Sequence, residues 1–254
     1  MNKKVLITGA GSGFGKGTAV ALATRGHKVI ATTETEAQAI ALRAEHPQIQ
    51  VEKLDITSSV DVAKAATLDL DVLINNAGAG ETGPMADVPI DRVRHLFEVN
   101  VFGTLAVTQA VLPKMAAKKS GRIIIVSSIG GVIAGPSFGP YSMTKHALEA
   151  MGKSMRAELA ASGIDVTLIN PGPYNTGFND RMAASMWEWF GDKAISAPAT
   201  DLLRAIGSMV TTNQMDPIDV VNRLVELVEA ETTTENNFMP PEIRDLVKAQ
   251  INAG

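Results

Sequence analysis

Two residues with acid–base chemistry lie four positions apart in the stretch YSMTK, namely Tyr141 and Lys145. Residues at this spacing share one face of a helix, so the phenol and the ammonium group should be neighbours. A phenol has an unperturbed pKa of about 10 and is a poor base at neutral pH, but nearby cations favour the phenolate. Lowering that pKa by about three units needs roughly 4 kcal/mol. The pair therefore predicts proton transfer by Tyr141, a contribution typically worth about 10²–10⁴ in rate.

A second chemical feature is the glycine-rich stretch TGAGSGFG at residues 8–15, which follows the apolar run VLI. Gly9, Gly13 and Gly15 leave a strand pattern and open a helical one. Missing side chains let backbone N–H groups approach a pyrophosphate at a helix N-terminus. The alternative is that the glycines only form a tight turn. The strand–glycine–helix context favours a dinucleotide site.

The elements that must position these residues alternate along the chain. Short apolar, β-branched runs predict strands at 4–8, 28–32, 50–54, 72–75, 122–127 and 165–170. Stretches with helical spacing lie between them, at 16–24, 36–45, 91–117 and 142–161. This alternation predicts an α/β fold, a doubly wound parallel sheet with helices on both faces. We expect a single domain over residues 1–254.

Polar and glycine residues follow the predicted strands where each one ends. They are the glycine stretch, Thr33-Glu34, Asp55, Asn75-Asn76-Ala77-Gly78, Ser127-Ser128 and Asn170-Pro171-Gly172. Parallel strands bring these ends to one edge of the sheet, where ligands of open α/β sheets bind. The ligand site is therefore expected at this edge.

Together these motifs resemble the short-chain dehydrogenase/reductase family, in its branch of about 250 residues. The pattern T-G-x-x-x-G-x-G, NNAG at 75–78, Asn100, Ser128, Tyr141-x-x-x-Lys145 and Pro171-Gly172 occur in the family's order and spacing. The resemblance implies a single-domain Rossmann fold and an NAD(P)-dependent oxidoreductase. It also implies hydride transfer between the nicotinamide and a secondary alcohol or ketone.

The resemblance also assigns roles to residues. Asn100, Ser128, Tyr141 and Lys145 are the implied catalytic set, in which Ser128 polarises the substrate oxygen, Lys145 binds the nicotinamide ribose and Asn100 holds a relay water. The implied cofactor-binding residues are Gly9, Ser12, Gly13, Phe14, Gly15, Thr33, Asp55, Ile56, Asn76, Ala77, Gly78, Tyr141, Lys145, Pro171, Gly172 and Thr176.

The residues after the second strand bear on which dinucleotide is used. NAD-binding relatives often carry Asp there, whereas this chain has Thr33 followed by Glu34. NADP-binding relatives usually have a basic residue at the position of Ser12 or Glu34. Glu34 would repel a 2′-phosphate, which favours NAD, while donation from Thr32 and Thr33 leaves NADP open.

The family builds its substrate lid after Pro171-Gly172, which here corresponds to about residues 173–215. Both tryptophans of the chain lie in this segment, with Tyr174, Phe178, Met182, Met186 and Phe190. We expect Tyr174, Met186, Trp187 and Trp189, with Ser128 and Tyr141, to contact a bulky apolar substrate. The alternative is that the lid residues pack the lid onto the body or a second subunit.

The C-terminal part departs from the family pattern. Many relatives end in a strand that helps form a tetramer, but here Pro240 and Pro241 limit strand pairing. We expect a helix over 242–251 instead, and little room for a helix between Asp55 and Asp71. A homodimer through the helices at 91–117 and 142–161 is the minimum assembly, and a homotetramer stays open.

Composition excludes several other classes. A formal net charge of −4 argues against nucleic acid and acidic membrane surfaces. The chain has no cysteine, and its four histidines lack metal-ligand spacing, so no metal site is expected. With neither a signal segment nor a long apolar run, a cytoplasmic protein without membrane contact is expected. The alternatives for function are a non-catalytic dinucleotide sensor or scaffold and a sugar-nucleotide epimerase or dehydratase, although the last usually has a larger C-terminal domain.

Overall fold

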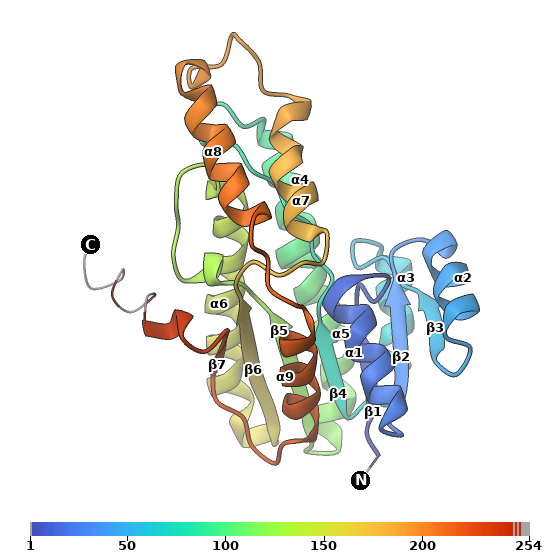
Figure 1. Ribbon diagram of the computed structural model, residues 1–254. Helices are drawn as coiled ribbons and strands as arrows, with labels where there is room; N and C mark the ends of the chain where they lie inside the picture. The colour runs from blue at the N-terminus through green and yellow to red at the C-terminus, as the bar shows by residue number, and fades with distance from the viewer. Residues whose placement is uncertain (1, 246, 248, 250–254) are drawn as a thin grey trace.

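One parallel sheet of seven strands forms the centre of the computed structural model, which describes residues 2–245, 247 and 249 (Figure 1). The strands are β1 (Lys4–Ile7), β2 (Lys28–Thr33), β3 (Gln50–Lys53), β4 (Val72–Asn75), β5 (Gly121–Val126), β6 (Ile164–Pro171) and β7 (Asn236–Met239). Their order is β3-β2-β1-β4-β5-β6-β7, and every neighbouring pair is parallel. The order reverses between β1 and β4, which is the switch point where such sheets bind ligands.

Each face of the sheet carries its own apolar core. Val5 and Ile7 of β1 point into one core, whereas Leu6 between them points into the other. The first core is covered by α1 (Gly13–Thr24), α2 (Glu36–Glu45) and α9 (Ile218–Glu229). The second is covered by α3 (Ser59–Ala65), α5 (Thr104–Ala117) and α6 (Gly139–Leu159). Burial on both faces explains why the strands are almost continuously apolar. The doubly wound α/β fold is confirmed.

The six strands expected from the sequence are all present, with ends shifted by one residue at most. The expectation that Pro240 and Pro241 limit strand pairing in the C-terminal segment was wrong. Strand β7 pairs in parallel with β6 from Leu168↔Asn236 to Pro171↔Met239. Pro240 and Pro241 follow the last paired residue, so neither interrupts the hydrogen-bond ladder. Of the helix expected over 242–251, residues 243–245, 247 and 249 are helical, and its remaining C-terminal positions lie outside the described residues.

The expectation that residues 55–71 leave little room for a helix was also wrong. Helix α3 occupies seven residues there and begins at the N-cap Ser58, whose hydroxyl accepts from the N–H of Asp61. One short turn before α3 and one after it complete the connection from β3 to β4. A helix of two turns is therefore enough to cross from β3 to β4.

A long helical rod spans Ile90–Ala117 and consists of α4 (Ile90–Phe97), a π-helical turn (Glu98–Gly103) and α5. By length and composition alone this rod could cross a membrane, a property shared by core helices of soluble proteins. Val107, Val111 and Met115 on one side of it are buried against the sheet. That packing accounts for its apolar character.

The segment 173–215 projects beyond the carboxyl ends of the strands (Figure 1, top, orange). It contains α7 (Phe178–Ser185) and α8 (Thr200–Thr211), which pack against each other. A single bridge between Tyr174 and Met215 closes the base of the segment. These helices therefore stand over the edge at which the polar strand ends meet.

Candidate active site

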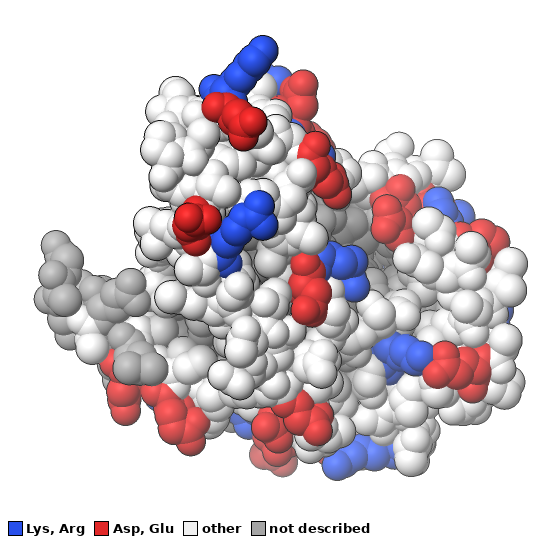
Figure 2. All heavy atoms as spheres, turned by 45° about the horizontal axis from the view of Figure 1, so that its top comes forward, with Lys and Arg blue, Asp and Glu red and all other residues white. Residues whose placement is uncertain are grey.

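A cavity of about 980 Å³ lies at the carboxyl ends of the strands. Figure 2 shows the surface hollowed between the protruding lid helices and the rest of the molecule. The cavity runs from the glycine turn before α1 to Tyr141 and Lys145 on α6. The glycine-rich stretch and the Tyr141–Lys145 pair therefore belong to one site.

The glycine turn has no room for side chains. Gly9 has φ +65°, and a Cβ on it would lie 2.6 Å from Ala77 Cα. Gly13 also has a positive φ, +54°, and faces Thr176 of the lid segment. Gly15 lies behind the turn, where a Cβ would meet the Asn76 amide at 2.5 Å. Gly9 and Gly13 therefore line the cavity, whereas Gly15 allows the close approach of α1 to the strand ends.

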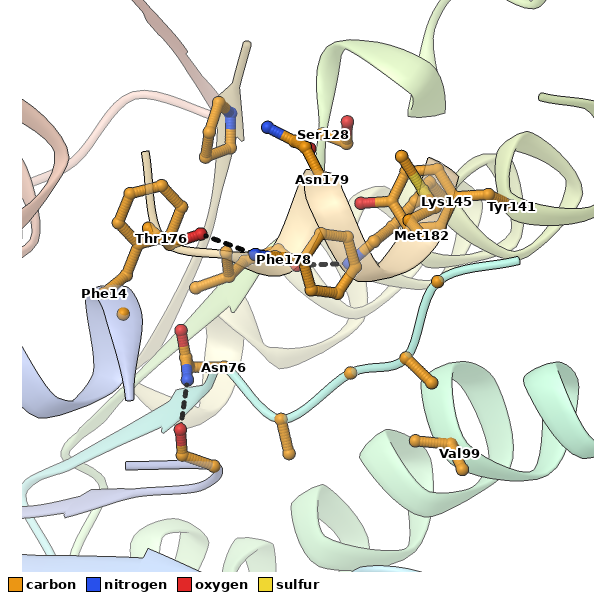
Figure 3. A pocket seen from close by; sticks show the side chains of 18 of the residues that line it. Phe14, Asn76, Val99, Ser128, Tyr141, Lys145, Thr176, Phe178, Asn179 and Met182 are labelled. Carbon is orange, nitrogen blue, oxygen red and sulfur yellow. Dashed lines mark hydrogen bonds between the residues drawn. The ribbon is translucent and has the colours of Figure 1, made fainter. Parts of the chain in front are cut away.

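Asn76 holds this turn in place. Its Nδ2 donates to the carbonyl oxygens of Thr8 and Gly9, each at 3.0 Å, as Figure 3 shows in part. The Thr8 hydroxyl accepts from the N–H groups of Asn76 and Ala77 at 3.0 and 3.1 Å. The first residues of α1, Gly13 and Phe14, line the cavity, and the N-terminus of a helix suits a pyrophosphate. The residues present thus fit a dinucleotide.

The expected cofactor residues can be placed one by one. Those that line the cavity are Gly9, Ser12, Gly13, Phe14, Thr33, Asp55, Ile56, Asn76, Ala77, Gly78, Tyr141, Lys145, Pro171, Gly172 and Thr176. Gly15 has the supporting position given above. Glu34 also lines the cavity and is exposed at its mouth.

Tyr141 lies in the first turn of α6 and is only 8% exposed. Burial raises the pKa of its phenol, and the Ser128 side chain acts in the opposite direction. The lowered pKa expected from Lys145 therefore does not arise from the protein alone, because removal from water disfavours the phenolate more strongly. In the protein alone, the Tyr141 phenol therefore keeps its proton and can donate it.

Lys145 lies one helical turn after Tyr141, as the spacing predicted, and its Nζ donates to the carbonyl oxygen of Val126 at 2.9 Å. The same Nζ lies 5.6 Å from the centre of the tyrosine ring. Burial lowers the pKa of this lysine to about 8, and the charge of Glu149 opposes that change. Figure 3 shows Ser128, Tyr141 and Lys145 at the same end of the pocket.

Asn100 lies in the π-helical turn, a feature often found at functional sites. Its side chain brackets Ala79, accepting from the backbone N–H at 2.8 Å and donating to the carbonyl oxygen at 2.9 Å. It also donates to Thr144 at 3.0 Å. Asn100 and Lys145 meet at Gly78, where a Cβ would lie 3.2 and 3.9 Å from their polar ends. Asn100 does not line the cavity, and its side chain positions the loop that does.

Apolar side chains enclose the cavity around Tyr141. Phe178 lies 5.8 Å from the tyrosine ring, and Phe138 and Met182 belong to the same cluster. Ile133 and Val210 are further apolar residues of the cavity lining. Phe178 and Met182 were expected in the lid segment, but not as site residues. The spacing of Phe138 three positions before Tyr141 was the available signal for that residue.

Of the expected substrate residues, Ser128, Tyr141 and Tyr174 line the cavity, but Met186, Trp187 and Trp189 do not. Tyr174 is 1% exposed and packs edge-on against Phe14 at 5.7 Å, toward the glycine turn. The other three follow the end of α7 and are absent from the cavity lining, so their contact with a substrate stays a prediction. Met182, one turn earlier, takes the place beside the tyrosine (Figure 3).

These three residues pack the lid instead. Trp189 lies against Gly83, where a Cβ would be 2.4 Å from its ring, and its Nε1 donates to Glu81 at 3.1 Å. Trp187 is half-exposed beneath Arg204, whose guanidinium carbon is 4.6 Å from the ring centre. Met186 is buried near Ser137. The packing alternative accounts for all three.

We predict that Trp189→Ala lowers the free energy of unfolding by about 2–3 kcal/mol, because a half-buried indole and its hydrogen bond to Glu81 are lost. Trp187→Ala is the matched control and should cost less than about 1 kcal/mol, since its stacking is exposed. Urea denaturation of both variants measures the difference. Equal losses would contradict the expected difference, and a selective rise in the Michaelis constant for bulky substrates would support the pocket-lining interpretation.

Comparison with known proteins agrees with this geometry. The family model described as short chain dehydrogenase matches residues 3–187. A Bacillus subtilis protein named "Uncharacterized oxidoreductase YusZ" is 40% identical over 213 residues, covering 79% of this chain and 73% of its own. A "3-ketodihydrosphingosine reductase" of Bacteroides thetaiotaomicron is 38% identical over 182 residues, covering 69% and 65%.

Solved structures show the same architecture. A short-chain dehydrogenase from Streptomyces avermitilis superposes with a TM-score of 0.84 at 28% identity, covering 100% of this chain and 94% of that one. Neighbours of this fold have been determined with NAD and with NADP.

Proposed function

Because the chain belongs to the short-chain dehydrogenase/reductase family, we propose that it interconverts a secondary alcohol and a ketone with a nicotinamide cofactor. Its membership makes it an oxidoreductase, and the substrate type is the proposal. The observation that carries it is the gathering of Ser128, Tyr141 and Lys145 at the apolar end of a cavity whose other end is the glycine turn.

The chemistry of the site follows from the residues. A nicotinamide held between the glycine turn and Lys145 would supply the hydride chemistry at the carbonyl carbon. In the reducing direction, the Ser128 hydroxyl donates a hydrogen bond to the carbonyl oxygen and the Tyr141 phenol gives that oxygen its proton. The ammonium of Lys145, about one helical turn away, stabilises the tyrosinate left behind until solvent returns the proton. Phe138, Phe178 and Met182 exclude water from the reacting oxygen.

The same apolar residues favour a bulky, largely apolar carbonyl compound. Phe138, Phe178 and Met182 pack in one cluster with Tyr141, and Ile133 and Val210 also line the cavity. One relative bears the name of a ketodihydrosphingosine reductase, which is consistent with such a substrate. Size and apolarity, more than charge, should therefore determine which ketones are accepted.

A carbonyl screen tests the proposal. Ketones of increasing size are offered with NADH and with NADPH, and oxidation of the cofactor is followed by absorbance. We expect turnover of bulky apolar ketones and little of small or ionic ones. Cofactor binding without turnover of any carbonyl compound would instead support the non-catalytic sensor or scaffold.

We propose NAD as the preferred cofactor. Glu34 is exposed at the mouth of the cavity, beside the expected ribose position after β2. The hydroxyls of Thr32 and Thr33 donate to the carbonyl oxygens of Ile7 and Thr35, at 3.1 and 3.0 Å, so they are engaged within the fold. A 2′-phosphate would meet a like charge at this point and no basic side chain at position 12 or 34.

We predict that Glu34→Arg lowers the dissociation constant for NADP by about tenfold or more, because repulsion is replaced by a charge-assisted hydrogen bond. Glu36→Arg, two residues further and on the exposed surface of α2, is the control for added charge alone. Titration of each variant with NAD and NADP measures the ratio. A wild-type protein that already prefers NADP contradicts the argument.

We also propose that the protein is a cytoplasmic homodimer or homotetramer. Phe102 on the helical rod and Met143 on α6 are large apolar side chains that are 53% and 43% exposed. A second copy of the chain covering both helices would bury them.

A further inference from the structure

The strongest unassigned feature beside the active site is a buried carboxylate. Glu149 lies on α6, eight residues after Tyr141 and four after Lys145, and is only 4% exposed. Buried carboxylates are costly unless they are paired or hydrogen-bonded. The mechanism above gives Glu149 no task, so its burial calls for a physical account.

The partners of Glu149 come from both strands at the edge of the sheet. Asn170 at the end of β6 donates from Nδ2 to Oε1 at 2.6 Å, and Asn236 of β7 donates from Nδ2 to Oε2 at 2.7 Å. Asn236 also donates to Oδ1 of Asn170 at 3.2 Å. Lys153, on the next turn of α6, places its Nζ 3.9 Å from Oε2. Every polar partner is a donor or a cation, which suits the ionised carboxylate.

The same network reaches Ser128. Nδ2 of Asn170 also donates to the backbone carbonyl of Ser128 at 3.2 Å. The turn after Ser128 packs directly on Glu149, since a Cβ on Gly131 would lie 3.0 Å from Glu149 Cγ and 2.8 Å from Ser127 Oγ. Glu149 therefore packs against the turn that follows Ser128 and is linked to it through Asn170. Ser128 carries the hydroxyl proposed to bind the substrate.

We propose that Glu149 is a positioning residue for the active site, acting on the Ser128 turn through Asn170 and on the Lys145 ammonium through its charge. This inference rests on the proposed oxidoreductase function. It gives the edge strand β7 a part in that function, because Asn236 holds one of the two carboxylate oxygens. Charged and titratable groups facing Glu149 among the described residues are Lys145 and Lys153, both on α6.

The decisive variant is Glu149→Gln, which keeps the shape of the side chain. The side-chain N–H groups of the glutamine would then face the N–H groups of Asn170 or Asn236, so one hydrogen bond would be lost. The negative charge would be lost as well. We expect kcat to fall by about ten- to hundredfold, with the cofactor dissociation constant unchanged within about threefold. Glu158→Gln on the exposed face of the same helix is the matched control and should behave as wild type.

The pH profile separates positioning from general loss of packing. Glu149 raises the pKa of Lys145, so removing its charge should make the lysine lose its proton at lower pH. The alkaline decline of kcat/KM should therefore move to lower pH in Glu149→Gln and stay in place in Glu158→Gln. Wild-type turnover with an unshifted profile in Glu149→Gln overturns the inference.

Two further measurements keep the test decisive. If Glu149→Gln does not fold, Asn236→Ala removes one partner from a half-buried position and should lower kcat in the same direction, whereas unchanged kcat counts against the inference. An NMR titration with labelled lysine, assigned by Lys145→Met, reports the Lys145 pKa without turnover. Failure of the wild type with every ketone refutes the proposed function, while the titration still decides whether Glu149 acts on Lys145.

Discussion

Replacing Tyr141 with phenylalanine should reduce turnover by at least about a hundredfold while leaving cofactor affinity within about twofold. The ring keeps its packing against Phe178, 5.8 Å away, so the fold of this end of the cavity is retained. Only the hydroxyl is removed, and with it the group whose proton passes to the substrate oxygen. Loss of kcat with unchanged binding is the pattern expected of an interaction made in the transition state.

Single-turnover kinetics and cofactor titration of the purified variant measure this effect. Tyr174→Phe is the matched control, because it removes the other tyrosine hydroxyl of the chain from a position near Phe14. Because its ring packs against Phe14 beside the glycine turn, kcat should stay close to the wild-type value, and any effect of a substrate contact should appear in the Michaelis constant. A Tyr141→Phe protein that keeps more than about a tenth of the wild-type rate removes this phenol from the mechanism.

Lys145→Met should affect both binding and turnover, which distinguishes it from the tyrosine variant. The ammonium is buried, donates to Val126 and lies above the Tyr141 ring. Its loss removes a proposed partner of the cofactor and the charge that stabilises the tyrosinate. We expect kcat to fall by about a hundredfold or more and the cofactor dissociation constant to rise by about tenfold.

The lysine also predicts a pH dependence with a definite sign. Burial lowers its pKa from 10.5 to about 8, so the charge is present below that value and is lost as pH rises through it. The kcat/KM of the wild type should therefore decline above about pH 8, and Lys145→Met should lack this decline. An alkaline limb that is the same in both proteins assigns it to another group.

Local sequence patterns determined the elements that build the site. Period and composition located the six strands from β1 to β6 because residues buried on both faces of a parallel sheet must be apolar. The spacing of Tyr141 and Lys145 predicted their common face, since the α-helical repeat is fixed. Gly9 and Gly13 were identifiable because a positive φ and a close approach to backbone require a missing side chain.

The tertiary structure decided the features that depend on residues distant in sequence. Pro240 and Pro241 suggested that no strand could form, but whether a proline disrupts a ladder depends on where pairing with β6 ends. Trp187 and Trp189 suggested a pocket by composition, but the direction of the chain after α7 places them against Gly83 and Arg204.

The protonation state of Tyr141 and the hydrogen bonds around Glu149 likewise could not be predicted from the sequence. The pattern YxxxK brings a cation close to Tyr141, but the depth of burial determines that the phenol keeps its proton in the protein alone. Asn170 and Asn236 are 66 positions apart and meet at Glu149 only because β6 and β7 are adjacent. The sequence by itself thus predicted which side chains carry the proposed chemistry. Only the packing of the sheet and lid decided their surroundings, because desolvation and hydrogen bonding arise from contacts that local spacing does not encode.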